Sequence, residues 1–324
     1  MSRLHLHILG SGSKGNCALI EGPRGLIMID EGLSRRETLK RMTELGLSAD
    51  NVSALLITHE HTDHIKGLDV WCKHWHGPLF ASRGTLSSKE NLSHLPVEEF
   101  DPGDTLSIAG IQVQTYSTSH DVINPVGYRF DALDDSIGFA TDTGELSSQA
   151  MNTLKDCRVL ALESNHDVTM LREGEYPRFL QERILSTKGH LSNDQAAEAA
   201  RELVTDRTEQ LIAMHISQDN NRPSLTVKSY AKALAATLDD EVGSSATLLQ
   251  GSRNLSIRPA SQYQPTTIVS VSYTHLIAKN LADDGAFRTA SIHSFVDHLF
   301  PFHIGAIVRF SRAKRRSNVD WGQT

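Results

Sequence analysis

The sequence predicts an α/β fold, in which buried strands alternate with helices. Three apolar segments have the length of a buried strand: Val52–Ile57, residues 159–162 and residues 211–214. Each of them ends in a polar segment that contains histidine, and a helix signal follows further along the chain. Because a rigid scaffold can aim side chains from the ends of its strands, we expect the functional site at these junctions.

The N-terminal segment is predicted to form strands and a hairpin. Residues 4–9 alternate in polarity, and a G-x-G-x-x-G sequence follows at residues 10–15. That fingerprint binds a dinucleotide where a helix begins at its glycines. Here residues 16–21 predict a second strand, residues 22–25 a turn and residues 26–29 a third strand. We therefore reject a Rossmann site and expect no nucleotide cofactor.

A helix and a strand lead from the hairpin to a histidine-rich loop. Ser34 and Glu37 have the spacing of a capping box, which predicts the start of a helix. The helix is expected to run to Leu45, with Gly46 as its stop. The apolar strand Val52–Ile57 follows, and apolar residues at helical spacing come after the loop. The loop therefore joins a buried strand to a helix.

The loop at residues 58–64, Thr-His-Glu-His-Thr-Asp-His, has the spacing of a metal site. His59 and His61 are two residues apart and can turn their imidazoles toward one ion. Asp63 and His64 can face a second ion a few ångströms away. Two ions about 3.5–4 Å apart can hold the attacking and leaving oxygens of a displacement. The alternative is a solvated surface loop, but the buried strand before it favours the metal site.

Further elements are predicted in the middle and the C-terminal part of the chain. Residues 84–95 are expected to form a short helix, and residues 105–115 a hairpin. Ser192 is predicted to cap a further helix, and Pro223 to begin an amphipathic helix that ends at about Leu238. The remaining predicted strands lie at residues 78–81, 128–130, 136–140 and 246–250.

The order of these motifs resembles the metallo-β-lactamase superfamily, whose signature is the loop at residues 58–64. Four further motifs are similar to its bacterial YycJ/WalJ subfamily: LGSGSKGN at 9–16, LESNHD at 162–167, GHLSN at 189–193 and HISQDNN at 215–221. The resemblance implies a four-layer αββα sandwich with a dinuclear metal site at one edge of the sheets. It also implies hydrolysis of phosphodiesters, as a DNA exonuclease.

The resemblance implies a full set of metal ligands. The first ion would be held by His59, His61 and His120, and the second by Asp63, His64 and His215, with Asp142 bridging both. Asp30 would orient the metal loop by hydrogen bonds. The two divalent ions are expected to be zinc, with manganese or iron as alternatives that fit the same ligands.

The catalytic residues are expected to be Asp63, His190 and Glu163. Water bridging the ions would attack phosphorus, because its pKa falls from about 15.7 toward about 7. In the related tRNA 3′-processing nucleases an acidic and a histidine residue protonate the leaving group, and Glu163 and His190 stand at similar places. The alternative for His190 is to anchor its loop. Ser11, Ser13 and Asn16 are candidates to line the substrate site, and His166 either binds phosphate or packs.

Net charge and cysteine content limit the partners and the cellular compartment of the protein. The chain of 324 residues has a net charge of −7, so any nucleic acid must be held by local positive charge. No apolar run is long enough for a membrane span, and we expect no membrane contact and no signal peptide. Three scattered cysteines indicate a reducing, cytoplasmic location. The oligomeric state is left open.

The chain is predicted to divide after residue 258 into a hydrolase domain, residues 1–258, and an atypical tail, residues 259–324. The tail has a net charge of +3, against −10 for the domain. Residues 271–276 resemble an adapter-derived sequence, so we expect residues 265–324 to be disordered or out of frame. The alternative is a basic tail that contacts DNA through Arg312, Lys314, Arg315 and Arg316.

Two other functions remain open on the same ligands. One is hydrolysis of a thioester or lactone, which needs the dinuclear site but not a Glu163–His190 pair. The other is a regulatory protein that binds metal without turnover. Structural zinc sites are usually closed and rich in thiolates, and this ligand set is neither, which disfavours the regulatory protein.

Overall fold

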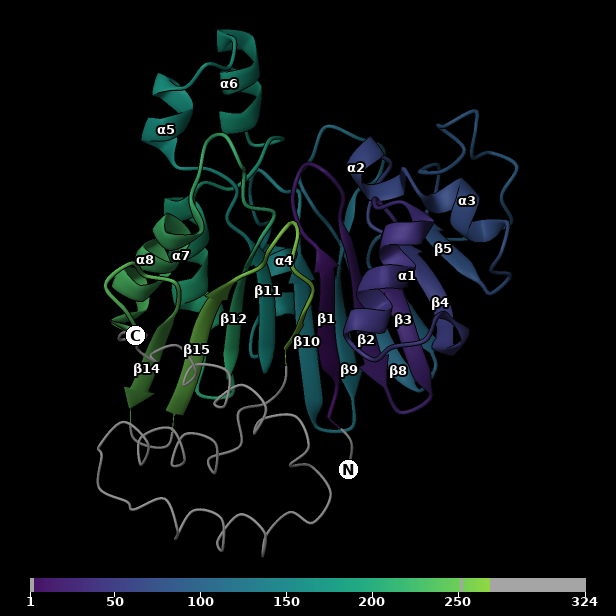
Figure 1. Cartoon of the computed structure of the whole chain (residues 1–324), viewed down its shortest axis with the longest axis horizontal. Helices are drawn as coiled ribbons and strands as arrows, with labels where there is room; N and C mark the ends of the chain where they lie inside the picture. Colours follow the sequence, from purple (N-terminus) through teal and green to yellow (C-terminus); the bar gives the residue numbers. More distant parts are fainter. Residues whose placement is uncertain (1–2, 251–252, 269–324) are drawn as a thin grey trace, which may run out of the picture. The chain divides into compact units, whose positions relative to one another are not determined.

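Two β-sheets stacked face to face form the centre of the computed structural model, which describes residues 3–250 and 253–268 (Figure 1). In this part of the chain the first sheet has seven strands in the order β16-β1-β2-β3-β4-β5-β6. Its strands are β1 (His5–Gly10), β2 (Cys17–Gly22), β3 (Gly25–Ile29), β4 (Val52–Ile57), β5 (Leu79–Ser82), β6 (Val97–Phe100) and β16 (Thr266–Ile268).

The second sheet has nine described strands in the order β13-β14-β15-β12-β11-β10-β9-β8-β7. They are β7 (Thr105–Ile108), β8 (Ile111–Ser117), β9 (Val126–Ala132), β10 (Asp135–Ala140), β11 (Val159–Glu163), β12 (Gln210–Met214), β13 (Thr237–Leu238), β14 (Ala246–Gln250) and β15 (Arg253–Pro259). The hairpin predicted at residues 105–115 is confirmed as β7 and β8.

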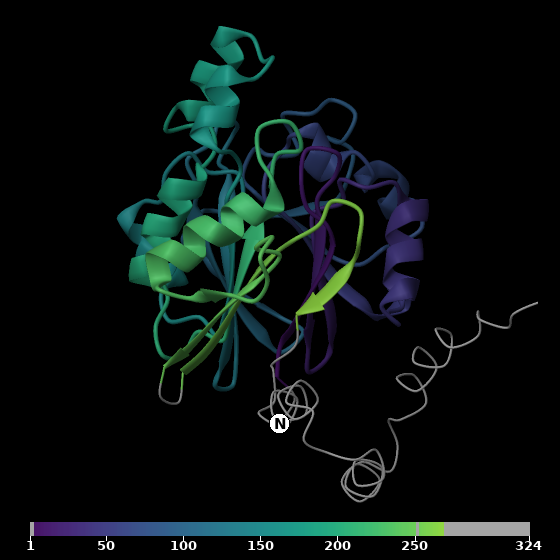
Figure 2. The same ribbon diagram turned by 60° about the vertical axis from the view of Figure 1, so that its left-hand side comes forward.

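Helices cover the outer face of each sheet (Figures 1 and 2). On the first sheet lie α1 (Arg35–Glu44), α2 (Thr62–Ile65) and α3 (Leu68–Cys72), with a 3₁₀ turn at Ala49–Asn51. On the second lie α4 (Ser148–Leu154), α7 (Asn193–Leu203) and α8 (Pro223–Leu234). In Figure 1, α5 (Val168–Glu173) and α6 (Arg178–Leu185) project beyond the sheets. The predicted αββα sandwich is confirmed.

The apolar strands are buried on both faces, which explains their continuous apolar sequence. In β3, Ile27 and Ile29 face the second sheet, while Leu26 and Met28 face the helices. In β11 the alternation is the same, with Ala161 toward the other sheet and the flanking leucines toward the helices. Burial of one such side chain stabilises the fold by about 1.5–3 kcal/mol.

Two local predictions were wrong. Residues 84–95 form turns instead of a helix, because serine hydroxyls bind nearby carbonyls: Ser88 Oγ donates to Thr85 O at 2.7 Å. The helix predicted to end at about Leu238 stops earlier, since Ala235 takes a left-handed conformation with φ of 56°. The residues that follow pair with β14 instead, as strand β13.

The C-terminal strand of the described chain closes the first sheet. β16 pairs with β1, and all the described residues lie in one compact unit, Met1–Ser270. The boundary predicted after residue 258 therefore falls inside this unit. The predictions for residues 269–324 lie outside the described residues. Of the helices that the structure describes, none is both long and apolar enough to cross a membrane.

Candidate metal centre

The functional residues meet at one edge of the sandwich because the strands that precede them run parallel. β3 pairs in parallel with β4, and β10, β11 and β12 form a parallel set in the second sheet. The carboxyl ends of these strands lie at the same edge. Asp30, Asp142 and His215, each just beyond a strand end, have φ of 58°, 51° and 51°. This left-handed conformation is unfavourable for residues other than glycine, so the surrounding fold must hold it.

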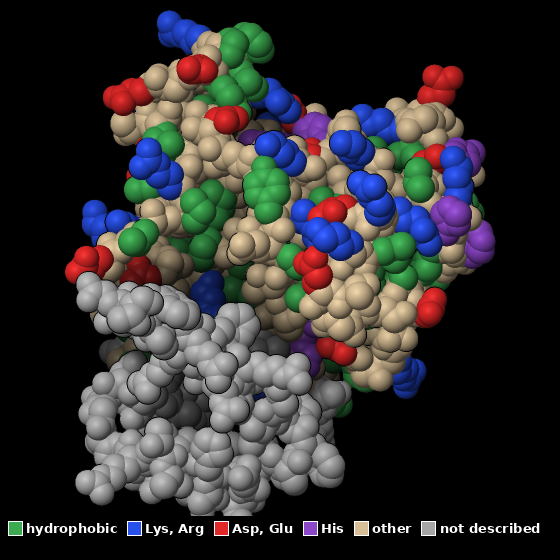
Figure 3. All heavy atoms as spheres, viewed as in Figure 1, with side chains coloured by type: hydrophobic (Ala, Val, Ile, Leu, Met, Phe, Trp, Pro, Cys, Tyr) green, Lys and Arg blue, Asp and Glu red, His purple; other side chains and the backbone are tan. Residues whose placement is uncertain are grey.

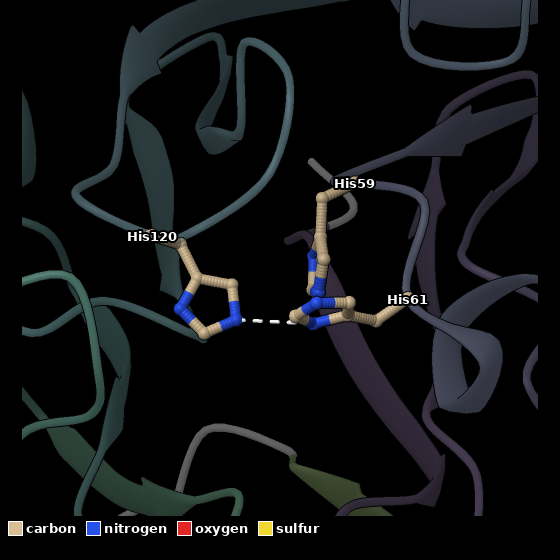
Figure 4. A group of neighbouring side chains, drawn as sticks. All are labelled: His59, His61 and His120. Carbon is tan, nitrogen blue, oxygen red and sulfur yellow. Dashed lines mark hydrogen bonds between the residues drawn. The ribbon is translucent and has the colours of Figure 1, made fainter. Parts of the chain in front are cut away.

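The first cluster consists of His59, His61 and His120, whose rings point toward one another (Figure 4). His59 and His61 come from the loop after β4, and His120 from the loop after β8. His120 Nε2 lies 3.1 Å from His61 Nδ1. His120 Nδ1 lies 3.0 Å from the carbonyl of Gly189, to which it can donate, which leaves Nε2 free to face the cluster.

The second cluster consists of Asp63, His64 and His215. His64 Nε2 and His215 Nε2 each lie 3.5 Å from Asp63 Oδ2. His64 Nδ1 is 2.7 Å from Asp30 Oδ2, and this contact fixes the orientation of the ring. Asp30 also accepts hydrogen bonds from the backbone N and the hydroxyl of Thr58, both at 2.8 Å. Asp30 therefore lies where the sequence prediction requires, behind the metal loop.

Asp142 lies between the two clusters. Its Oδ1 is 3.9 Å from His120 Nε2 of the first cluster and 3.2 Å from His215 Nδ1 of the second. Its Oδ2 is 3.2 Å from His64 Nε2 and accepts a hydrogen bond from the Thr141 hydroxyl at 2.6 Å. A carboxylate in this position can offer one oxygen to each of two ions.

The donor set fits two divalent ions. His59 Nε2 is buried in the first cluster without a hydrogen-bond partner, which is costly unless another group uses its lone pair. Burial, followed by the charge of His64, holds the pKa of His59 well below its ordinary value. Burial and then His120 lower the pKa of His61 to about 4. Both imidazoles are therefore neutral at pH 7, which is the form that binds a metal ion.

Glu163 connects the second cluster to His190. Its Oε1 lies 2.8 Å from His190 Nδ1 and 3.0 Å from His215 Nδ1. Its Oε2 accepts hydrogen bonds from the backbone N atoms of Thr143 and Leu191. Burial alone would raise the pKa of Glu163, but His190 and then His215 bring it down to about 2. Glu163 is thus a carboxylate that orients two imidazoles.

The predicted substrate residues do not lie together. Ser11 and Asn16 are buried beside the second cluster: the Ser11 hydroxyl accepts from His215 N at 2.8 Å, and the Asn16 amide donates to Asp63 Oδ2 at 3.0 Å. Ser13 is exposed on the same loop. His166 is 1% exposed, and neither ring nitrogen has a hydrogen-bond partner. Burial lowers its pKa to about 4. Ser11 and Asn16 therefore lie where they can position the proposed metal ligands His215 and Asp63. The sequence did not indicate this role.

A cleft of about 550 Å³ opens beside the first cluster, where His61 and His120 form part of its wall. Lys89 and Lys188 also line it, together with Glu60 and residues 121–123. Neither lysine could be predicted from the sequence, because neither belongs to a motif. Only their positions in the sequence could have pointed to the site. Lys188 lies two residues before His190, and Lys89 lies in the segment that was predicted to be a helix.

Comparison with known proteins shows which family the chain resembles. Residues 26–216 match the family model described as a beta-lactamase superfamily domain. The chain is 36% identical to exodeoxyribonuclease YycJ of Bacillus anthracis, over 71% of this chain and 89% of that protein. It is 34% identical to exodeoxyribonuclease WalJ of Streptococcus pneumoniae, over 70% and 87%.

A solved structure supports the fold itself. The metallo-beta-lactamase fold protein YhfI from Bacillus subtilis superposes with a TM-score of 0.57 at 13% identity, covering 82% of this chain and all of that one. At this identity the likeness concerns the fold alone.

Proposed function

This chain belongs to the metallo-β-lactamase superfamily and to the same family as the YycJ and WalJ proteins, and we propose that it is a metal-dependent exodeoxyribonuclease. The reaction is hydrolysis of a phosphodiester bond at a dinuclear metal site. One observation carries the proposal. Both clusters and Asp142 converge at one edge of the sandwich, beside the hydrogen-bonded pair of Glu163 and His190.

The proposed ligands of the two ions follow the two clusters. His59, His61 and His120 would hold the first ion, Asp63, His64 and His215 would hold the second, and Asp142 would bridge them. When bound, the ions supply an acidified water as the nucleophile and neutralise charge that develops on the phosphate. We favour zinc over manganese or iron, because five of the seven proposed ligands are imidazoles.

His190 is the proposed general acid for the leaving alkoxide. Its Nδ1 bonds to the Glu163 carboxylate, so its Nε2 is the nitrogen left to carry the proton that is transferred. The His190 side chain is 16% exposed, which allows contact with a substrate. Glu163 cannot approach the substrate in the same way, since it is fully buried. Its role is to fix the ring and to balance the charge of a protonated imidazole.

Local positive charge supports a nucleic-acid substrate on a chain that is acidic as a whole. Lys89 and Lys188 line the cleft that leads to His61 and His120. Lys and Arg side chains also gather over the upper part of the face shown in Figure 3. Phosphate contacts from such side chains provide most of the sequence-independent affinity for DNA. We also propose a cytoplasmic location, since Cys17, Cys72 and Cys157 are all free thiols.

A substrate panel tests the proposal. The metal-loaded protein is given single- and double-stranded DNA labelled at the 5′ or 3′ end, a chromogenic phosphodiester and a thioester. We expect release of mononucleotides or short products from one end of the DNA, and none from the Asp142→Ala variant. Turnover of the thioester without DNA cleavage would favour the acyl hydrolase. Bound metal without turnover of any substrate would favour a regulatory protein.

A further inference from the structure

A separate group of potential metal ligands lies at the far end of β1 from the metal centre. His5 and His7 are two residues apart on this strand, and Glu21 is directly opposite His5 on β2. Alternate residues of a strand share a face, and directly opposite residues share it too, so the three side chains lie together. Gly10, the end of β1 next to the metal centre, lies five positions after His5, a span of about 17 Å.

The donor atoms already stand at the separations that an ion requires. Glu21 Oε2 lies 3.0 Å from His5 Nδ1 and 3.2 Å from His7 Nε2. One donor atom from each of the three residues can be chosen so that all lie within 4.8 Å of one another. A tetrahedral ion with bonds of about 2.1 Å holds its donors about 3.4 Å apart, so only small side-chain movements are needed.

A partner on β16 orients His7. Its Nδ1 lies 2.8 Å from the hydroxyl of Thr267, whose oxygen can accept a hydrogen bond. With the proton on Nδ1, the bare Nε2 faces the Glu21 carboxylate, and two acceptors then stand opposite each other in a site where the His7 side chain is 4% exposed. A cation between them satisfies both. Ligand histidines in metalloproteins are oriented by an outer hydrogen bond of this kind.

We propose that His5, His7 and Glu21 form a second metal site, which binds a divalent transition-metal ion of the zinc class. Two imidazoles and one carboxylate favour such an ion over magnesium or calcium, which prefer oxygen ligands. Three protein ligands leave a coordination position for water. The ion joins β1 to β2 and, through His7 and Thr267, supports the pairing of β16 with β1.

The rival explanation is a proton. A proton on His7 Nε2, with the Thr267 hydroxyl donating to Nδ1, or a protonated His5 would bond to Glu21 at the same distances, and no metal would be required. The two explanations differ in stoichiometry, because only the metal site adds a bound ion that does not belong to the catalytic centre.

The test is zinc content at buffered free zinc, measured on the full-length protein and on two variants, Glu21→Gln and His5→Gln. Both substituted side chains are partly exposed, so the variants are expected to fold, and an unchanged circular dichroism spectrum verifies that they do. The matched control is the double variant His74→Gln/His76→Gln, which removes two exposed histidines with the same spacing. A zinc-dependent rise in Tm is recorded for each protein as a second readout.

We expect the unsubstituted protein and the control to hold one more zinc per chain than either variant, and to gain more Tm from zinc. Equal zinc content in all four proteins overturns the proposal, as the proton pair predicts. So does a loss of zinc in the control that matches the loss in the variants, which would indicate unspecific binding to surface histidines. Neither result depends on whether the catalytic centre cleaves DNA.

Discussion

The two clusters of the metal centre use different chemistry to hold their imidazoles. The first cluster contains three histidines and no carboxylate of its own, and the His61 side chain is 29% exposed toward the cleft. In the second cluster His64 and His215 are 0% and 4% exposed, and each contacts carboxylates on more than one side. The first cluster opens to the cleft, where Asp121 Oδ1 lies 3.6 Å from His61 Nε2 and 3.7 Å from His120 Nε2, and the second is closed and held by nearer carboxylates.

This difference indicates that the two clusters have different roles in the site. The closed cluster is positioned by groups that never meet substrate, such as Asp30 behind His64 and Glu163 behind His215. The open cluster borders the cleft, where a substrate phosphate can approach. We infer that the second ion is bound more rigidly, whereas the first ion is the one that exchanges with solvent and meets the incoming strand.

The largest effect is expected from Asp142→Ala, because Asp142 is the residue that both clusters share. Activity should fall more than about 100-fold, beyond the range seen for partners outside the ligand shell, and metal content should drop at both positions. Hydrolysis rates and metal analysis measure this. Asp101→Ala is the control, since the Asp101 side chain is 60% exposed and pairs with Arg83 outside the cleft. A loss confined to one ion would refute the bridging position.

His190→Ala is expected to have the next largest effect, since general acids contribute about 10²–10⁴-fold. The loss should be large for DNA, whose leaving alkoxide needs a proton, and small for an aryl phosphodiester with a good leaving group. Steady-state rates on both substrates measure the difference. Glu163→Gln should show the same preference, although it also disturbs His215. Equal slowing of both substrates would rule out the acid role and leave His190 as a loop anchor.

The residues of the metal centre could be predicted from the sequence, whereas the residues of the surface around it could not. The ligands sit at the ends of apolar strands, and strand pattern, residue spacing and family resemblance all point to them. The fold class and the capping box at Ser192 could be predicted for the same reason, because they depend on local sequence. That these residues bind metal stays a prediction, although the structure brings them together.

What the sequence could not indicate depends on contacts between distant segments. Lys89 lies in a turn that serine hydroxyls create, and the left-handed conformation of Asp142 and His215 is imposed by the surrounding structure. The pairing of β16 with β1 joins residues about 260 positions apart, and no periodicity reveals it. The placement of Ser11 behind His215 is of the same kind.

The two clusters should also differ in how their metal affinity depends on pH. Burial alone would lower the pKa of His215, but Asp142 and the other carboxylates raise it to about 10. The pKa of His64 is likewise raised despite its burial. Both rings are therefore protonated at pH 7 without metal, and an ion must displace those protons. In the first cluster the rings are already neutral, as the lowered pKa of His61, about 4, illustrates.

Affinity for the second ion should therefore rise with pH, by up to about tenfold per pH unit for each displaced proton. Affinity for the first ion should stay level between pH 6 and about pH 8. Calorimetry in buffers of different ionisation enthalpy counts the protons released. We expect the second cluster to release up to two more protons than the first, whose imidazoles release none. Equal proton release by both ions would contradict the contrast between the clusters.

The smallest effect concerns the cleft beside the first cluster. Lys89→Ala and Lys188→Ala should raise KM for DNA several-fold and leave kcat nearly unchanged, because phosphate contacts by lysine add affinity without taking part in the reaction. Each substitution should reduce the slope of log affinity against log salt by about 0.7 on single strands. Lys73→Ala, outside the cleft and paired with Asp69, is the control. If KM for a small chromogenic phosphodiester rose as much as KM for DNA, the lysines would act on the scissile phosphate itself, and the cleft would not be the path of the strand.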